Sequence, residues 1–222
     1  MKPLKTDETK VRRRSRTAIE KNEKKKKIVE TALDLLFKDQ GGELPSVDNI
    51  AKASSVAKGT IYLYFRTKEE IFLYAMDVYF KNWFNEIKTA LKEKEAINST
   101  EFSRIFSSPV LDNEQFLKLA SMKRLVFQRG LSSELILSHK DMIVAGVRDV
   151  ASEISRITSR TNEECEKLIM RSYGVVLGCH YISYPPKGNM TTLSEEEKSI
   201  LLLNLDEDIN HILNCLFERF LN

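Results

Sequence analysis

Five side chains that can bind phosphate groups or base edges lie close together near the N-terminus. They are Lys58, Thr60, Tyr62, Tyr64 and Lys68. A lysine ammonium group can donate to guanine N7 or O6 in the major groove, and tyrosine and threonine hydroxyls can donate to phosphate oxygens. Ile61 and Phe65 lie four residues apart, so on a helix they share an apolar face that holds the polar side chains outward. The segment therefore predicts a small helix that enters the major groove of double-stranded DNA, although Tyr62 and Tyr64 could instead be core aromatics.

A helix-turn-helix arrangement would position these side chains. A short helix is expected after Pro45, with Ser46 as its N-cap, followed by a turn and a second helix over residues 57–65. The helix-turn-helix motif is thus predicted at about residues 46–65.

Longer helices are expected on both sides of this motif. Apolar residues at helical spacing predict a helix over residues 24–40, ended by Gly41-Gly42. Thr67 and Glu70 form a capping-box pattern that opens a long helix reaching about residue 95.

The residue order across about residues 24–72 resembles the tetracycline-repressor (TetR) family of bacterial transcriptional regulators. The resemblance is carried by the run VAKGTIYLYFRTKEEI from Val56 to Ile71 and by apolar residues of the preceding helices, Ile28, Ala32, Leu33, Phe37, Val47, Ile50, Ala51 and Ala53. It implies an all-α fold of about nine helices. Residues 23–70 would form the DNA-binding domain, and residues 71–222 a helical domain for effector binding and dimerisation.

The resemblance also implies roles for single residues. Lys58 and Tyr62 would lie nearest the base edges, while Thr60, Tyr64 and Lys68 would hold phosphates. Gly59 would let the helix start approach the DNA backbone closely, and Ser46 joins the same DNA-binding set. Two positions depart from the family pattern: Ser55 stands where glycine is usual, and Ala57 where serine is usual. Ser55 must therefore adopt the turn conformation at some strain, and Ala57 lacks a capping hydroxyl.

Positive charge is concentrated around the motif. Residues 1–68 carry 17 Lys and Arg against 9 Asp and Glu, a net charge of +8, whereas the remaining residues carry 18 against 23, a net charge of −5. This asymmetry is typical of a nucleic-acid-binding domain on a more acidic body. Residues 1–22 are polar and aperiodic, so we expect a disordered basic arm that reaches phosphates or a minor groove. A merely solvated tail is the alternative.

The rest of the chain repeats a helical pattern with no alternating strand signal. Helices are expected from Asp112 to about Gly130, over residues 133–159 with a break near Ser138-His139, from Thr161 to Pro185, and from Ser194 to Leu221. The resemblance implies a small-molecule effector, and flexible or aromatic residues are the pocket candidates, each of which could equally be core. They are Phe116, Met122, Phe127, Met142, Met170, Tyr173 and Tyr181. These residue types favour an apolar or aromatic effector.

A near-palindromic DNA operator requires a two-fold symmetric protein, so we expect a homodimer. Its interface is predicted on the last two helices, over residues 162–183 and 195–221. Small and apolar residues there are the candidates: Gly174, Gly178, Ile209, Leu213, Leu216, Phe217 and Phe220. The alternative for part of this set is the monomer's own core.

Other function classes find little support. The N-terminus lacks an apolar signal core, no apolar run approaches the roughly 18 residues of a membrane helix, and three cysteines do not suggest a disulfide framework, so a cytoplasmic protein is expected. Glu207, His211 and Cys215 share a helix face that could hold a metal, but an interface ridge is the simpler interpretation. We expect no enzyme activity, metal or cofactor. The sequence predicts a DNA-binding transcriptional regulator, a repressor in the family's usual mode, with a helical protein–protein interaction module as the alternative.

Overall fold

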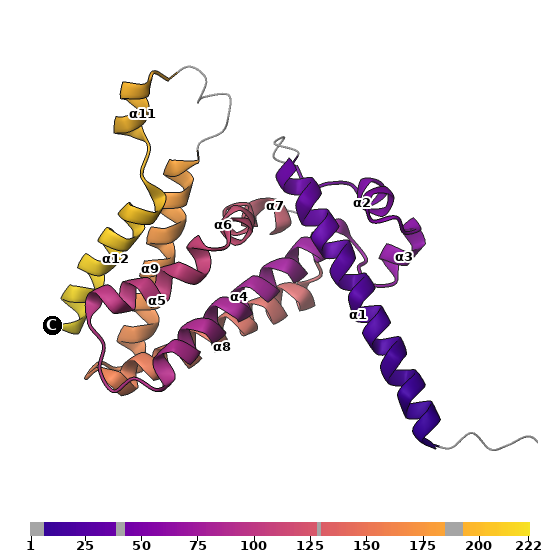
Figure 1. The fold of residues 1–222 in the computed structure, drawn as a ribbon, viewed down its shortest axis with the longest axis horizontal. Helices are drawn as coiled ribbons and strands as arrows, with labels where there is room; N and C mark the ends of the chain where they lie inside the picture. The colour runs from indigo at the N-terminus through magenta and orange to yellow at the C-terminus, as the bar shows by residue number, and fades with distance from the viewer. Residues whose placement is uncertain (1–6, 39–42, 128–129, 185–192) are drawn as a thin grey trace, which may run out of the picture. The chain divides into compact units, whose positions relative to one another are not determined.

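The computed structural model describes residues 7–38, 43–127, 130–184 and 193–222 (Figure 1). These residues are helical almost throughout and contain no strand, so the predicted all-α fold is confirmed. The chain forms two compact units. The first comprises Met1–Ala75 and Leu125–Leu131, and the second comprises Met76–Arg124 and Ser132–Asn222. The boundary falls inside one long helix, five residues after the position expected from the sequence.

The first unit contains α1 (Asp7–Lys38), α2 (Val47–Ser54), α3 (Lys58–Tyr62) and the first part of α4 (Lys68–Lys92). Its core consists of apolar side chains at helical spacing, which include Ile28, Ala32, Leu36, Ile50, Ile61, Phe65, Ile71 and Phe72. Lys25 adds a cation–π contact, because its Nζ lies 3.6 Å from the ring centroid of Tyr74. Burial is the main cause that lowers the pKa of Lys25, followed by repulsion from Lys21.

The expectation of a disordered arm over residues 1–22 is wrong for residues 7–22, which form the first turns of α1. This stretch is rich in Lys, Arg and Glu, which are good helix formers, and contains neither glycine nor proline. The stretch has too few apolar residues to show a helical periodicity, so its helix propensity was overlooked. Residues 1–6 and the Gly41-Gly42 stop lie outside the described residues.

The second unit holds the rest of α4 together with α5 (Ser99–Leu111), α6 (Glu114–Ser121), α8 (Ser133–Ile157), α9 (Asn162–Ser183), α11 (Glu195–Leu201) and α12 (Leu205–Leu221). The short α7 (Lys123–Phe127) lies at the boundary between the two units. Capping boxes begin α9 at Thr161–Glu164 and α11 at Ser194–Glu197, as predicted.

Several helices of this part of the chain differ from the prediction, and the one expected from Asp112 to about Gly130 is divided into α6 and α7. Helix α5 was not expected, because it contains Pro109 and several serines that weaken its apolar pattern. Asn113, and not Asp112, caps α6, since its side chain accepts from the Phe116 N–H. Helix α8 is unbroken at Ser138-His139, because His139 is buried and pairs with Asp77. The last expected helix is divided into α11 and α12, and Asn204 caps the second part.

An aromatic cluster forms the centre of the second unit. Trp83 is almost fully buried, and its indole N–H donates to the carbonyl oxygen of Phe106 at 3.0 Å. The rings of Phe80 and Phe116 meet edge to face with their centroids 5.1 Å apart. Edge-to-face pairs and a satisfied indole N–H give this core directional contacts in addition to apolar burial.

Helices α4 and α8 lie side by side and run in the same direction (Figure 1). The contacts Asp77–His139, Phe84–Gly146, Lys88–Asp149 and Leu91–Arg156 follow one another along both helices at a nearly constant offset in sequence. Because residue numbers rise together on both helices from one contact to the next, α4 and α8 pack parallel to each other.

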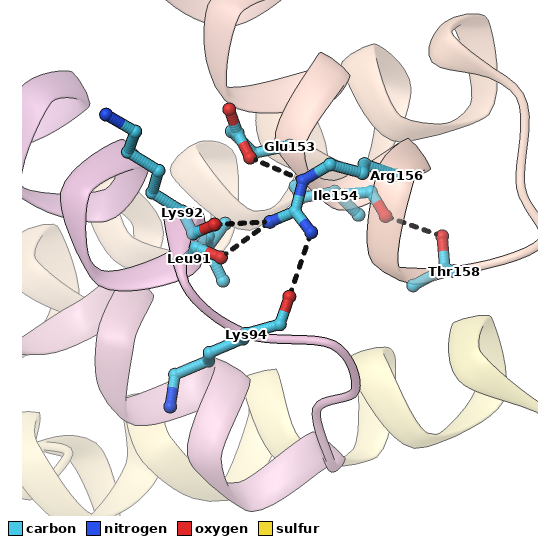
Figure 2. A network of polar contacts seen from close by, with 7 residues as sticks. All are labelled: Leu91, Lys92, Lys94, Glu153, Ile154, Arg156 and Thr158. Carbon is cyan, nitrogen blue, oxygen red and sulfur yellow. Dashed lines mark hydrogen bonds and ion pairs between the residues drawn. The ribbon is translucent and has the colours of Figure 1, made fainter.

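Arg156 caps the C-terminal end of α4 (Figure 2). Its guanidinium group donates to the carbonyl oxygens of Leu91 at 2.8 Å, Lys92 at 3.1 Å and Lys94 at 2.9 Å, and also to the carboxylate of Glu153 at 2.9 Å. The last carbonyls of a helix have no partner within it and carry partial negative charge, so a cation with several donors satisfies them. Arg156 therefore fixes the end of α4 to α8.

The substitution Arg156→Lys tests this cap. Lysine keeps the charge but cannot bond three diverging carbonyls at once, so we expect the free energy of unfolding in urea to fall by about 1–2 kcal/mol. Arg148→Lys is the matched control, because the Arg148 guanidinium is 70% exposed and lies 3.8 Å from Glu166. Equal stability of the two variants would contradict the role given to Arg156.

Candidate nucleic-acid interface

The turn between α2 and α3 is defined by backbone geometry at both ends. Ser46 caps α2 as predicted, because its side chain accepts from the Asn49 N–H at 3.2 Å. Ser55 ends α2 in the left-handed conformation with φ of 57° and ψ of 40°. The Ser55 N–H donates to Lys52 O, and the Val56 N–H donates to Ala51 O at 3.1 Å. These two bonds satisfy the last carbonyls of α2.

Both predicted departures from the family pattern are visible in this turn. Ser55 is the only residue other than glycine with a positive φ in the described parts of the chain. A side chain in this conformation costs roughly 1–2 kcal/mol relative to a right-handed one. Ala57 occupies the N-cap of α3 and makes no side-chain capping bond. The turn thus forms without the two residues that would stabilise it best.

Helix α3 is shorter than residues 57–65, the range expected from the sequence. It ends at Tyr62, and the N–H groups of Tyr64 and Phe65 both donate to the carbonyl oxygen of Ile61. Ile61 and Phe65 are buried as predicted. Anchored by these two side chains, α3 directs its opposite face to solvent.

The exposed face of α3 carries Lys58, Gly59 and Tyr62, the last 48% exposed. Thr60 is half-buried beside them. A Cβ atom added to Gly59 would meet nothing within 4 Å, so the space beside its backbone is open. Lys58 Nζ lies 2.8 Å from Asp48 Oδ2, and this hydrogen bond is the main cause that raises the pKa of Lys58. The structure therefore brings the predicted base-reading residues onto one accessible surface.

Lys68 has a structural contact that the sequence did not indicate. Its Nζ donates to the carbonyl oxygen of Leu44 at 3.0 Å and is partly buried. The start of α4 is capped by Thr67, whose hydroxyl accepts from the Glu70 N–H at 3.3 Å. The Glu70 carboxylate accepts from the Arg66 N–H at 2.8 Å, one residue before the position that a capping box requires. Lys68 thus joins the start of α4 to the segment before α2.

Two residues of this surface were missed by sequence reasoning. Leu63 is 76% exposed directly after α3, although an apolar residue at this point suggests core. Lys21 Nζ lies 5.9 Å from the ring centroid of half-buried Tyr64, which places a cation of α1 beside a predicted phosphate contact. Only the long α1 helix gives Lys21 this position, and the helix was not predicted so far toward the N-terminus.

The predicted effector residues have different environments in the structure. Phe116 and Tyr173 belong to the aromatic cluster, where burial raises the pKa of Tyr173 to about 12. Met122 is half-buried, Met170 and Tyr181 are 48% and 71% exposed, and Phe127 belongs to the first unit. Met142 lines a cavity between α4 and α8. A common role of these residues in effector binding therefore stays a prediction.

The predicted dimer residues divide into two groups. Ile209, Leu213 and Phe217 are fully buried in the second unit, where the Phe217 ring stacks on Phe102 at 4.2 Å between centroids. In the monomer these three therefore serve its own core, which was the alternative interpretation. The second group is accessible: Gly174 and Gly178 are exposed on α9, and Leu216 and Phe220 are half-buried on α12.

His180 was not among the predicted site residues, but its environment is unusual. Its side chain is 4% exposed, and neither ring nitrogen has a hydrogen-bond partner among the described residues. Burial is the main cause that lowers its pKa, and the positive charge of Lys118 adds to the effect. Both effects favour the neutral imidazole, whose ring centroid lies 5.0 Å from that of Tyr184.

The described ranges show no side-chain cluster suited to metal binding. No three His, Cys, Asp or Glu side chains there gather to hold a metal ion. Cys165, Cys179 and Cys215 are free, and burial raises the pKa of the Cys165 thiol to about 11. None of the described helices is long and apolar enough to cross a membrane.

Two family models match successive parts of the chain. Residues 28–75 match the model of the tetR family of bacterial regulatory proteins, and residues 77–218 match the tetracyclin repressor-like C-terminal domain. The HTH-type transcriptional regulator YuxN of Bacillus subtilis (strain 168), itself uncharacterized, is 32% identical over 100 residues, which are 44% of this chain and 34% of YuxN. YerO of the same organism, also an uncharacterized HTH-type regulator, is 34% identical over 67 residues, 30% of this chain and 23% of YerO. The chain thus spans about a third or less of these relatives.

Two solved structures share the fold. The fatty acid degradation regulator FadR from Bacillus halodurans aligns with a TM-score of 0.54 and 16% identity, covering 85% of this chain and 97% of that one. A protein from Mesorhizobium loti described as a TetR-family transcriptional regulator aligns with a TM-score of 0.55 and 17% identity, covering 90% and 96%. At these identities the likeness shows the fold alone.

The substitution Ser55→Gly tests the strain in the turn. Glycine adopts the left-handed conformation without a Cβ penalty but loses more entropy on folding, so we expect a net gain of about 0.5–1 kcal/mol in the free energy of unfolding. Ser55→Ala is the control, because alanine keeps the Cβ and should give no gain. Denaturant unfolding of the three proteins measures the difference, and an unchanged Ser55→Gly midpoint would show that the turn is unstrained.

Proposed function

Because the chain belongs to the tetR family of bacterial regulatory proteins, we propose that it is a transcriptional regulator that binds a near-palindromic DNA operator as a homodimer. The observation that carries the proposal is the exposed face of α3. Lys58, Gly59 and Tyr62 lie there together, and Ile61 and Phe65 anchor the helix from behind. We further propose that it acts in the cytoplasm as a repressor and that a small-molecule effector releases it, as is usual in this family.

In this proposal α3 lies in the major groove, with Lys58 and Tyr62 toward the base edges. The open space beside Gly59 allows the α3 backbone to approach the DNA closely. Thr60, Tyr64 and the N-terminus of α2 at Ser46 face phosphates, and Lys21 adds a charge beside Tyr64. Lys68 contributes less than expected, because one of its donors already bonds Leu44.

DNA binding is tested with the substitution Lys58→Gln. Fluorescence anisotropy with the DNA upstream of the protein's own gene, in the presence of competitor DNA, should show specific binding that weakens steeply with salt. Lys58→Gln should weaken specific binding about tenfold or more, because a lysine–base contact is worth about 1–3 kcal/mol. Lys92→Gln is the control, because it makes the same charge change at an exposed position of the second unit.

Two outcomes would contradict the proposed function as a DNA-binding regulator. Absence of DNA binding at low salt would reject it and favour the protein-interaction module, for which exposed Leu63 would be the contact residue. Equal DNA affinity of Lys58→Gln and Lys92→Gln would reject the role of α3 in reading the operator.

We propose that the homodimer forms through the exposed side of α9. Gly174 and Gly178 lie four residues apart, and a Cβ atom at either would meet nothing within 4 Å. Met170 and Tyr181 are exposed on the same helix, 48% and 71% respectively. Small residues that allow close approach beside exposed apolar side chains are suited to a helix–helix interface. Leu216 and Phe220 of α12 are the predicted neighbours in the interface.

The substitution Gly178→Arg should separate the dimer. Sedimentation at micromolar concentration should give a dimer for the native protein and a monomer for the variant, with unchanged helix content, because the glycine position is open in the monomer. Ala145→Arg places the same side chain at an exposed position of α8 and should remain dimeric. A native monomer, or a dimeric Gly178→Arg protein, would contradict the proposed interface.

A further inference from the structure

A cavity of about 190 Å³ lies between α4 and α8 in the second unit. Its lining comes from four residues of α4, Lys81, Phe84, Asn85 and Lys88, and four of α8, Met142, Ala145, Gly146 and Asp149. Ligand sites for drug-sized molecules have volumes of about 300–1,000 Å³, so this cavity fits a smaller ligand. The parallel packing of the two helices brings these residues together.

The floor of the cavity is apolar and closely packed. A Cβ atom on Gly146 would lie 2.1 Å from Cδ2 of Phe84, so only glycine lets the Phe84 ring pack directly on the α8 backbone. Phe84 is buried at 5% exposure, whereas Met142 is half-buried. Together with Ala145 these side chains offer a compact apolar surface to a ligand.

The rim of the cavity carries a net positive charge. Lys88 Nζ lies 2.8 Å from Asp149 Oδ2, so these two charges compensate each other. Lys81 is exposed and forms no ion pair with any residue in the described parts of the chain. Asn85 follows Lys81 by one helical turn and contributes an amide with two donors. The cavity thus pairs an apolar floor with one uncompensated cation and a neutral donor.

We propose that this cavity binds a small monocarboxylate with a compact apolar body. The carboxylate accepts from Lys81 and Asn85, and the apolar body covers Phe84 and Met142. A charged hydrogen bond to an ammonium group is stronger than a neutral one, so the ligand is distinguished from its uncharged analogues. This narrows the apolar or aromatic effector expected from the sequence to an acidic one.

That this ligand is the effector rests on the proposed regulatory function. Helix α4 runs from the first unit into the second, and the cavity lies on its second half. A ligand that binds α4 and α8 together favours conformations in which these helices keep the spacing that it fits. By linkage, such a ligand changes DNA affinity by the factor by which DNA changes ligand affinity.

The test uses benzoate as the probe and the full chain labelled with ¹⁵N. We expect saturable NMR shifts of the Gly146 backbone amide and the Asn85 side-chain amide. Lys81→Gln should weaken benzoate binding about five- to tenfold, as expected for loss of a charged hydrogen bond at a partly open site. Lys92→Gln, an exposed lysine on the same helix, should bind benzoate as the native protein does. Ala145→Leu fills the cavity from an exposed position and should abolish binding without loss of helix content.

Several results would overturn the proposal. If benzamide bound as tightly as benzoate, the carboxylate would have no role in binding. If inorganic phosphate bound as tightly as benzoate, the apolar floor would have no role in binding. Equal benzoate affinity of Lys81→Gln and Lys92→Gln would show that Lys81 does not bind the carboxylate. The effector role is tested separately, by measuring DNA affinity with and without benzoate. Benzoate binding without a change in DNA affinity would overturn only the effector role. A chain that binds benzoate but no DNA would overturn the regulator and leave the cavity site standing.

Discussion

Helix α4 excludes ten apolar side chains from water between Ile71 and Leu91, on more than one of its sides. A helix at the surface of a domain buries a single stripe, so a helix this apolar must be covered by several neighbours. Ile71 and Phe72 complete the core of the first unit, and Trp83 and Ile87 that of the second. Each large side chain contributes about 1.5–3 kcal/mol on burial. Neither unit has a complete core without α4, whose start is capped by Thr67 and whose end is bonded by Arg156.

Local signals in the sequence predicted most of the helix starts correctly, because a helix start is encoded within four residues. Ser46, Thr161 and Ser194 each cap the helix expected of them. The errors arose where two local signals compete. Pro109 concealed α5, yet the helix forms because Phe102 and Phe106 are buried against Phe217 of α12. The asparagine cap at 113 was missed because Asp112 offered a plausible cap beside it, and the one at 204 because a single continuous helix was expected from Ser194 to Leu221.

The sites were less predictable than the fold, because periodicity identifies a buried face but not the partner that buries it. Ile209, Leu213 and Phe217 have the spacing of an interface stripe, but α5 already covers them within the monomer. Asn210 confirms this placement, since its side-chain oxygen accepts from Ser107 at 2.7 Å and its backbone oxygen from Ser103 at 3.0 Å. In the proposed dimer, the surface left for the partner is marked by exposure, in particular of Gly178 and Tyr181. Likewise Lys81 and Gly146 have no distinctive sequence context, and only the packing of α4 on α8 brings them to one cavity.

The pairing of Lys58 with Asp48 has a consequence for how α3 would read DNA. In the free protein the ammonium group already holds a carboxylate at 2.8 Å, and the side chains are 48% and 68% exposed. An exposed pair of this kind contributes little to stability, so a guanine that offers two acceptors would replace Asp48 at small cost. A base that offers no acceptor leaves Lys58 with Asp48, and the carboxylate then faces a strongly negative groove. If Lys58 reads a base as proposed, the pair would lower affinity slightly for every sequence and would penalise a base without an acceptor most, which would make Lys58 a selective contact.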